Sequence, residues 1–249
     1  MIILKSLQEI EKIRKACIVV ADVLEEMKSQ VRPGVSTLAL DEFAEKFIRS
    51  AGALPAFKGY RGYPKTLCTS VNSEVIHGIP TRDVVLKQGD LVSIDVGAIV
   101  DGFYGDAAIT LPVGNIELET ERLIKVTEES LYRGIAQTTV QNRLYDISHA
   151  VQGYVEINGY SVVREFVGHG IGRSLHEDPQ VPNFGAPGQG PRLKPGMVLA
   201  IEPMVNMGGS ATVVKEDNWT AVTADGSLSA HFEHTVAVMP DGPWILTKK

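Results

Sequence analysis

The chain has 249 residues, and 24 Lys and Arg against 30 Asp and Glu give a formal net charge of −6. Hydrophobic residues make up 44% and charged residues 22%, which excludes extended disorder and collagen-like repeats. The acidic balance argues against nucleic acid or an anionic membrane as the main partner, because both attract positive charge. The two cysteines, Cys17 and Cys68, could form at most one bridge, which excludes a disulfide scaffold and favours a reducing compartment.

The first segment predicts a helix rather than a signal peptide. Charged residues interrupt the apolar run that a signal peptide needs, and Ser6 followed by Glu9 is typical of a capping box. Apolar residues from Leu7 to Leu24 then recur at helical spacing, which makes Cys17 a core residue. No apolar run approaches the ~20 residues that span a bilayer, so we expect a cytoplasmic protein with no membrane partner.

The order of the expected elements favours an α+β fold. Helices are expected at 7–30, 38–51, 117–136 and 143–158, with a loop rich in Gly and Tyr at 57–64. Strands are expected at 66–72, 91–99, 103–111, 161–167, 197–205, 211–215 and 231–239. Because the strands come as adjacent pairs, an antiparallel sheet is favoured over a doubly wound parallel one.

An internal repeat relates the two halves of the chain. Residues 86–95 have the sequence LKQGDLVSID and residues 193–202 have LKPGMVLAIE, and a His-Gly-Ile segment precedes each. A further acid then opens an apolar strand, Asp106 in the first case and Glu233 in the second. Three features in the same order predict a duplicated fold. The expected organisation is a single domain, 1–249, with halves of about 1–112 and 113–249.

Four acids are expected to converge where these halves meet. Asp95 and Asp106 lie on two strands joined by Asp101-Gly102, a strong hairpin turn sequence, and the implied register puts both carboxylates on one face. Glu202 and Glu233 hold the equivalent positions in the second half. Apolar neighbours indicate that these strands are buried, where an unpaired carboxylate would become neutral or cost several kcal/mol.

Such a cluster predicts a metal site. Carboxylates ~4 Å apart repel by about 1–4 kcal/mol per pair, and no Lys or Arg flanks them in the sequence. Two divalent cations would balance the four charges, and His169, in a Gly-rich segment, is the natural fifth ligand. Oxygen donors with one imidazole favour Mn, Fe or Co over a thiolate or multi-histidine zinc site, and zinc itself stays open. A metal pair that activates water indicates hydrolysis, and the lack of a phosphate loop favours an amide over a phosphate ester.

Taken together, these segments resemble the type I methionine aminopeptidases, metallopeptidases of the pita-bread fold. The resemblance covers essentially the whole chain. It is carried by the opening segment 4–12, by the substrate-side motifs at 59–64, 70–72 and 77–80, and by the metal motifs around Asp95, Asp106, 168–172, 201–203 and 233–235.

The resemblance implies an enzyme that removes the initiator methionine from nascent proteins and peptides whose second residue is small. Asp95 would bind one metal ion, and His169 and Glu202 the other. Asp106 and Glu233 would bridge the two.

It also implies three catalytic residues. Glu202 would shuttle the proton of the attacking water, and His176 would donate to the scissile carbonyl or its oxyanion. His77 would contact the substrate near its amino end and help to stabilise the intermediate. His149, His231 and His234 are expected to be structural, although the last two flank Glu233, where support of a metal ligand is an open alternative.

The resemblance further implies a pocket for the methionine side chain. Its expected lining is Tyr60, Tyr63, Cys68, Trp219, Phe57 and Leu175. Phe57 and Leu175 differ from the residues common in the family but stay apolar, and Tyr104 replaces a frequent histidine beside Asp106. Asn72 and Ser229 match positions that hold a monovalent cation in relatives.

Two alternatives stay open. Xaa-Pro aminopeptidases and prolidases carry the same ligands but have a long N-terminal domain that this chain lacks. A non-catalytic pita-bread binding protein would typically have lost metal ligands, and here none is missing. Type II methionine aminopeptidases carry a helical insertion between the last two glutamates, whereas Glu202 and Glu233 are close in this sequence. We expect a monomer whose substrates are nascent chains. Any contact with the ribosome would then be made by the surface of the catalytic domain.

Overall fold

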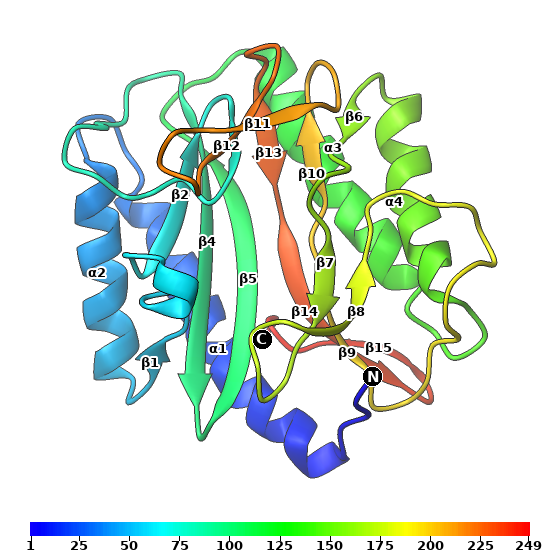
Figure 1. Cartoon of the computed structure of the whole chain (residues 1–249). Helices are drawn as coiled ribbons and strands as arrows, with labels where there is room; N and C mark the ends of the chain where they lie inside the picture. Colours follow the sequence, from blue (N-terminus) through cyan, green and yellow to red (C-terminus); the bar gives the residue numbers. More distant parts are fainter.

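Four helices cover one side of a large antiparallel sheet in the computed structural model, which describes residues 1–249 (Figure 1). Two helices lie behind the N-terminal strands and two beside the C-terminal strands (Figure 1). No helix is long and apolar enough to cross a membrane. The helices are α1 (Leu7–Gln30), α2 (Thr37–Ser50), α3 (Leu118–Ala136) and α4 (Leu144–Ile157), close to the predicted spans.

Helix α1 begins with the predicted capping box. The Ser6 hydroxyl accepts from the Glu9 backbone N–H, and the Glu9 carboxylate accepts from the Ser6 N–H, so two N-terminal donors are satisfied. Cys17 lies in the buried face of the helix, as expected. A Cβ on Gly105 would stand 2.5 Å from the Cys17 backbone nitrogen, so this glycine allows α1 to pack directly against the sheet.

The large sheet has nine strands in the order β1-β4-β5-β14-β9-β7-β8, with β2 added on β4 and β15 on β14. Every pairing is antiparallel, which confirms the expected α+β class. Its strands are β1 (Leu54–Pro55), β2 (Leu67–Val71), β4 (Leu91–Val100), β5 (Phe103–Pro112), β7 (Gly168–Gly170), β8 (Glu177–Val181), β9 (Val198–Ile201), β14 (Glu233–Met239) and β15 (Gly242–Ile245).

Two small sheets stand at one end of the large one (Figure 1). Their strands are β13 (Ser229–His231), β10 (Met204–Asn206) and β6 (Ser161–Val162) in the first sheet, and β11 (Thr212–Val214), β12 (Ala221–Thr223) and β3 (Glu74–Ile76) in the second. The expected loop at 57–64 contains a short 3-10 turn, η1 (Tyr60–Gly62).

Three predicted strands differ from the structure. The expected strand 161–167 ends after Val162, and the strands at 197–205 and 231–239 are each broken in two. Pro203 has no N–H to donate and stands in the first break, where the chain leaves the large sheet for a small one. Strands β1, β3, β7, β8, β12 and β15 were not expected, because they are short and alternation over two to five residues is a weak pattern.

The N-terminal and C-terminal strands meet through a short contact between β5 and β14. Residues 107–108 pair with 233–234, and no further residue pair joins the two strands. Beside this pairing the Thr235 hydroxyl donates to the Asp106 carbonyl at 2.7 Å and accepts from the Asp106 N–H at 3.3 Å. A side chain thus continues the connection where the backbone ladder stops.

Candidate metal centre

The β4–β5 hairpin positions the first two acids. Its turn residues, Asp101 and Gly102, have φ of 51° and 76°, the left-handed conformation that a tight hairpin of this kind requires. The register pairs Gly97 with Asp106, as predicted, and Asp95 with the residue two positions further along β5. Asp95 and Asp106 therefore share one face, while the alternate residues of β4 pack toward the helices.

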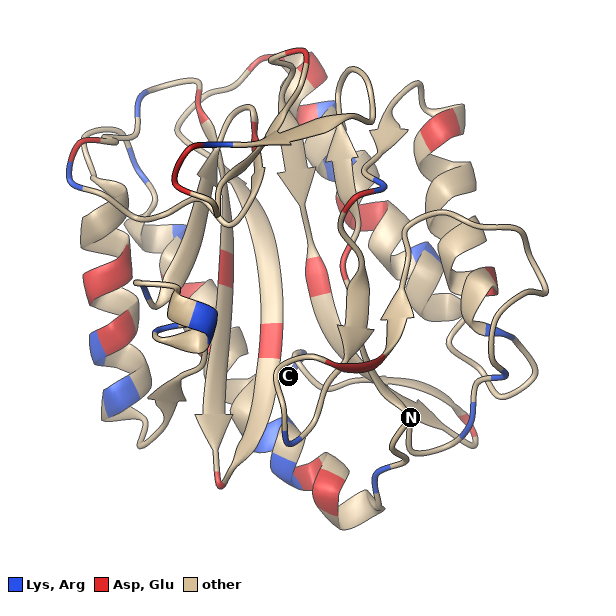
Figure 2. Ribbon diagram, viewed as in Figure 1, with Lys and Arg blue, Asp and Glu red and all other residues tan.

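The other two acids stand where strands break. Glu202 follows the last residue of β9, and Glu233 is the first residue of β14, directly after the break at Phe232. Acidic residues lie within β4 and β5 and at the start of β14 (Figure 2). These three strands contain no Lys or Arg. No basic side chain of this sheet region can neutralise the acids.

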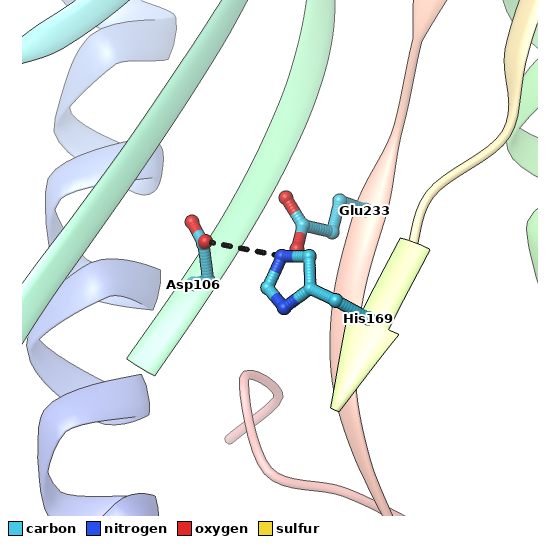
Figure 3. A group of neighbouring side chains, drawn as sticks. All are labelled: Asp106, His169 and Glu233. Carbon is cyan, nitrogen blue, oxygen red and sulfur yellow. Dashed lines mark ion pairs between the residues drawn. The ribbon is translucent and has the colours of Figure 1, made fainter. Parts of the chain in front are cut away.

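His169 reaches the acids from β7, which pairs with β9. Its Nε2 lies 3.5 Å from Glu202 Oε1 and 4.0 Å from Asp106 Oδ2. Ligand atoms of Asp106, His169 and Glu233 all lie within 4.8 Å of one another, and the three side chains point toward a common space (Figure 3). A Cβ on Gly168 would clash with the carbonyl oxygen of Ala200, so this glycine lets β7 approach β9.

The donor atoms fit a cation. Asp95 Oδ1, Asp106 Oδ1 and Glu233 Oε1 are buried and have no hydrogen-bond partner, which is rare for buried polar atoms. Burial raises the pKa of Asp95 to about 7. Burial and the neighbouring carboxylates raise the pKa of Asp106, Glu202 and Glu233 well above the ordinary range. A divalent ion would both satisfy these oxygens and favour their ionised form.

His176 lies beside His169, with ring centroids 4.2 Å apart. Its Nδ1 is 2.8 Å from the Tyr60 hydroxyl and the two rings stack, which leaves Nε2 free for another partner. Burial lowers the pKa of His169 to about 3, and the neighbouring His176 contributes a smaller part of this shift. The His169 imidazole is therefore neutral and can be a ligand.

His77 occupies a different setting from His169. It has a φ of 59° and its ring makes edge contacts with Phe166 and Trp219, at 5.9 and 6.2 Å between centroids. Burial lowers the pKa of His77 to about 4. Its ring therefore meets aromatic side chains rather than the carboxylates.

His231 is a neighbour of the site that sequence reasoning left among the structural residues. Its Nε2 is buried without a hydrogen-bond partner and lies 3.8 Å from Glu202 Oε2. The position of His231 two residues before Glu233 indicated only that it could support a metal ligand. Its contact with Glu202 was not predicted, because His231 belongs to β13 and approaches Glu202 at the break between β13 and β14. His149 lies in α4, and His234 faces the opposite side of β14, where its Nδ1 is 2.8 Å from the Thr247 hydroxyl.

The residues expected to line the methionine pocket form one apolar cluster next to the acids. Tyr63 and Trp219 meet edge to face at 5.0 Å, and a Cβ on Gly97 would stand 2.7 Å from the Phe57 ring, so this glycine makes room for Phe57. Cys68 pairs with Asp95 across β2 and β4, which brings the cluster beside the carboxylates. The cluster contains Phe57, Tyr63, Cys68 and Leu175, with Tyr60, Tyr104 and Trp219 packed against it.

The expected monovalent-cation residues are adjacent. The Ser229 N–H donates to the Asn72 carbonyl at 2.9 Å. Their side-chain oxygens already have partners, since Asn72 Oδ1 accepts from the Leu91 N–H and the Ser229 hydroxyl donates to Asn206 Oδ1. Neither of these side-chain oxygens is therefore left buried without a partner.

A cavity of about 530 Å³ lies on the helix side of the sheet, between α1 and α3. His234 lines it, whereas the preceding residue, Glu233, belongs to the acidic cluster on the other face. Strand alternation separates the two spaces, so this cavity is not the site that the acids form.

Comparison with known proteins identifies the class. The model of metallopeptidase family M24 matches residues 11–240. The solved structure of a methionine aminopeptidase from Thermotoga maritima superposes with a TM-score of 0.99 at 48% identity, over 100% of both chains. The chain belongs to metallopeptidase family M24 and has its pita-bread fold.

Relatives within the family narrow this further. A methionine aminopeptidase from Clostridium perfringens is 58% identical over 99% of both sequences, and methionine aminopeptidase 1 from Bacillus subtilis is 54% identical over 100% of both. The chain is a member of the type I methionine aminopeptidases, as the sequence motifs predicted.

The prolidase alternative is less well supported. Solved prolidases, Xaa-Pro peptidases and a dipeptidase are 19–23% identical to this chain, and the chain covers 61–66% of their length. These matches show a common fold, with TM-scores of 0.75–0.80, and carry no further likeness in activity.

Proposed function

We propose that this metallopeptidase removes N-terminal methionine with Asp95, Asp106, His169, Glu202 and Glu233 as its metal ligands. The single observation that carries the proposal is the set of buried carboxylate oxygens without partners, which face one another from strands of both sequence repeats. Divalent ions held there would supply Lewis acidity and lower the pKa of a water molecule. Asp106 and Glu233, from neighbouring strands, would be shared between two ions.

Glu202 takes the proton of the attacking water and returns it to the amine that leaves. Bound divalent ions would hold the Glu202 carboxylate in its ionised form, in which it can accept a proton. Its two oxygens lie 3.5 Å from His169 Nε2 and 3.8 Å from His231 Nε2, so two imidazoles are close neighbours of this carboxylate.

His176 and His77 act on the substrate rather than on the ions. His176 would donate from Nε2 to the scissile carbonyl oxygen, whose negative charge grows in the transition state. The hydrogen bond between Nδ1 and the Tyr60 hydroxyl supports this role, because it leaves Nε2 as the ring nitrogen that can face the substrate. His77, held between Phe166 and Trp219, would contact the substrate near its amino end.

Specificity for methionine would come from the apolar cluster beside the acids. An unbranched thioether suits a pocket of aromatic and sulfur-bearing side chains, which is what this cluster offers. Its lining residues would be Tyr60, Tyr63, Cys68, Trp219, Phe57 and Leu175.

The finer parts of the proposal concern the ions and the setting. We propose two ions per chain, of Co, Mn, Fe or Zn, with the identity set by availability because similar ions compete for such donors. The chain would be one catalytic domain whose halves, about 1–112 and 113–249, each supply acids. It would act in the cytoplasm, as a monomer, on nascent chains.

Release of free methionine tests the activity directly. Protein stripped of metal should be inactive on Met-Ala-Ser and regain activity on titration with Mn or Co. Leu-Ala-Ser is the control for the pocket and Leu-Pro-Ser the control for the prolidase alternative, because neither begins with methionine. If the metal-loaded protein released no methionine, or cleaved Leu-Pro-Ser as well as it cleaved Met-Ala-Ser, the proposal would fail.

A further inference from the structure

A buried ion pair ties the N-terminal segment to the loop that carries His176. Lys5 Nζ lies 2.6 Å from Glu177 Oε2, and the two side chains are only 4% and 7% exposed. Lys5 Nζ also donates to the Ile3 carbonyl at 3.0 Å. By contrast, the equally short pair between Lys28 and Glu25 has side chains that are 54% and 71% exposed.

Two glycines make room for Lys5. A Cβ on Gly172 would stand 2.6 Å from Lys5 Cε and 2.8 Å from Glu177 Oε1, so the last glycine of the segment 168–172 faces the ion pair. A Cβ on Gly196 would stand 2.6 Å from the Lys5 carbonyl, while the Lys5 N–H donates to the Gly196 carbonyl at 2.7 Å. The pair thus fits a space shaped on both sides, unlike a chance surface contact.

The ion pair holds a loop that is already anchored at its ends. The second oxygen of Glu177 accepts from the Ser174 N–H at 3.1 Å, and Gly172 donates its N–H to the Ser174 carbonyl. The Tyr104 N–H donates to the Gly172 carbonyl at 2.9 Å, which fixes the start of the loop on β5. Glu177 pairs with Gly170 at the start of β8, which fixes its end.

His176 is the residue that precedes Glu177 in this loop. Its backbone is therefore set by the position of Glu177, and its ring is set against His169. Lys5 is the one cation within ion-pair distance of Glu177. Without Lys5, a buried carboxylate would be left uncompensated, and it would move the loop toward water.

We propose that Lys5 and Glu177 are positioning residues, whose ion pair fixes the orientation of His176 toward the scissile carbonyl. This inference rests on the proposed role of His176. Neither residue needs to touch the substrate, because a displacement of ~1 Å at a donor can lower a rate by about 100-fold.

A double-mutant cycle tests the inference in the metal-loaded enzyme. Lys5→Met should lower kcat for Met-Ala-Ser about 10- to 100-fold and leave KM within about twofold, since the donor acts on the transition state. His176→Ala should lower kcat by about 100-fold or more. Combining the two should cost less than about threefold beyond His176→Ala, because both changes remove the same donor.

Two further variants separate positioning from stability. Lys5→Met with Glu177→Gln removes both charges, so it should keep a thermal transition near that of the parent while kcat stays about tenfold low. Val151→Ala, a buried change in α4, should lower the thermal transition with kcat unchanged.

The outcomes are distinct. Unchanged kcat in Lys5→Met, or losses that multiply in the double variant, would overturn the positioning role. Full kcat in His176→Ala would overturn the proposed role of His176 and the inference with it. A low kcat in Val151→Ala that followed its stability would attribute the Lys5 effect to general destabilisation and also overturn the inference.

Discussion

The two strand pairs that supply the acids share a sequence pattern and differ in their continuity. In the N-terminal pair, Asp95 and Asp106 lie within unbroken ten-residue strands whose register is regular from end to end. In the C-terminal pair, Glu202 and Glu233 stand at breaks where the chain passes between two sheets.

The difference shows what each pair can contribute. An unbroken hairpin fixes two carboxylates through its backbone ladder, with little freedom for the side chains. A break admits further neighbours: His231, from a small sheet, approaches Glu202 there, and so does His169 from the adjacent strand β7. The residue proposed to carry protons is therefore the acid that two imidazoles approach within 4 Å.

The largest expected effect tests the unbroken pair. Asp106→Ala should abolish metal binding and lower kcat/KM by about 10³-fold or more, because the ions supply several kcal/mol of transition-state stabilisation. Metal content measured by elemental analysis, with methionine release, checks both. Asp101→Asn, at the exposed turn of the same hairpin, is the matched control and should bind metal normally. Retained metal in Asp106→Ala would contradict the proposed ligand set.

The next effect compares the two His-Gly-Ile segments, which the repeat makes equivalent. His169→Ala should lose metal together with activity. His77→Ala should keep its metal and lose about 100-fold in kcat/KM, because it removes one donor to the substrate. Elemental analysis of the two variants side by side decides the matter, and equal metal loss in both would show that the repeat preserves role as well as sequence.

A smaller effect concerns the glycines that follow these histidines. A Cβ on Gly78 would meet the Thr69 carbonyl oxygen, and a Cβ on Gly170 would meet that of Asp178. Gly78→Ala and Gly170→Ala should each lower the free energy of unfolding by about 1–3 kcal/mol, as overpacked sites do. Denaturant titration measures this, with Gly153→Ala, where a Cβ meets open space, as control. A neutral result at either site would contradict the close packing.

The last prediction concerns the pH dependence of stability, which is set by the buried acids of both strand pairs. Burial raises the pKa of Asp95 to about 7, and the pKa values of Asp106, Glu202 and Glu233 are raised well above the ordinary range. Acids of the unfolded chain ionise near pH ~4. The metal-free fold thus keeps protons that the unfolded chain has lost, and stability falls as pH rises through the folded pKa values.

Above pH ~7 the buried histidines, whose pKa values in the fold are lowered to about 3 or 4, do not offset this slope, since they are neutral in both states. The free energy of unfolding of metal-free protein should therefore fall by about 1.4 kcal/mol per pH unit for each retained proton. Denaturant titrations between pH 7 and 9 measure it. Added Mn should reverse the slope, because it binds the ionised carboxylates. A slope unaffected by Mn would be evidence against binding at the acids.

Local patterns predicted much of this molecule. The β4–β5 register followed from an Asp-Gly turn and alternating burial, both written within a few residues. The capping box of α1 is equally local. The convergence of Glu202 and Glu233 with these strands followed from the repeat, because repeated sequence implies repeated placement.

What the sequence could not predict depends on long-range packing. The contact between His231 and Glu202 arises from a strand break, which Pro203 hints at without fixing its geometry. The ion pair between Lys5 and Glu177 joins residues 172 positions apart, and no periodicity encodes such a partner. Short strands such as β7 form because neighbouring strands pair with them, not because their own residues require it.

The contact between β5 and β14 is the one place where N-terminal and C-terminal strands of the large sheet pair. Only residues 107–108 and 233–234 pair there, and the Thr235 hydroxyl bridges the next position. A contact made by so few hydrogen bonds can open locally at a low cost in free energy. Asp106 and Glu233 stand on opposite sides of this contact, so an ion bound by both would hold the N-terminal and C-terminal strands together. Bound metal should therefore slow hydrogen exchange of the backbone amides at this contact.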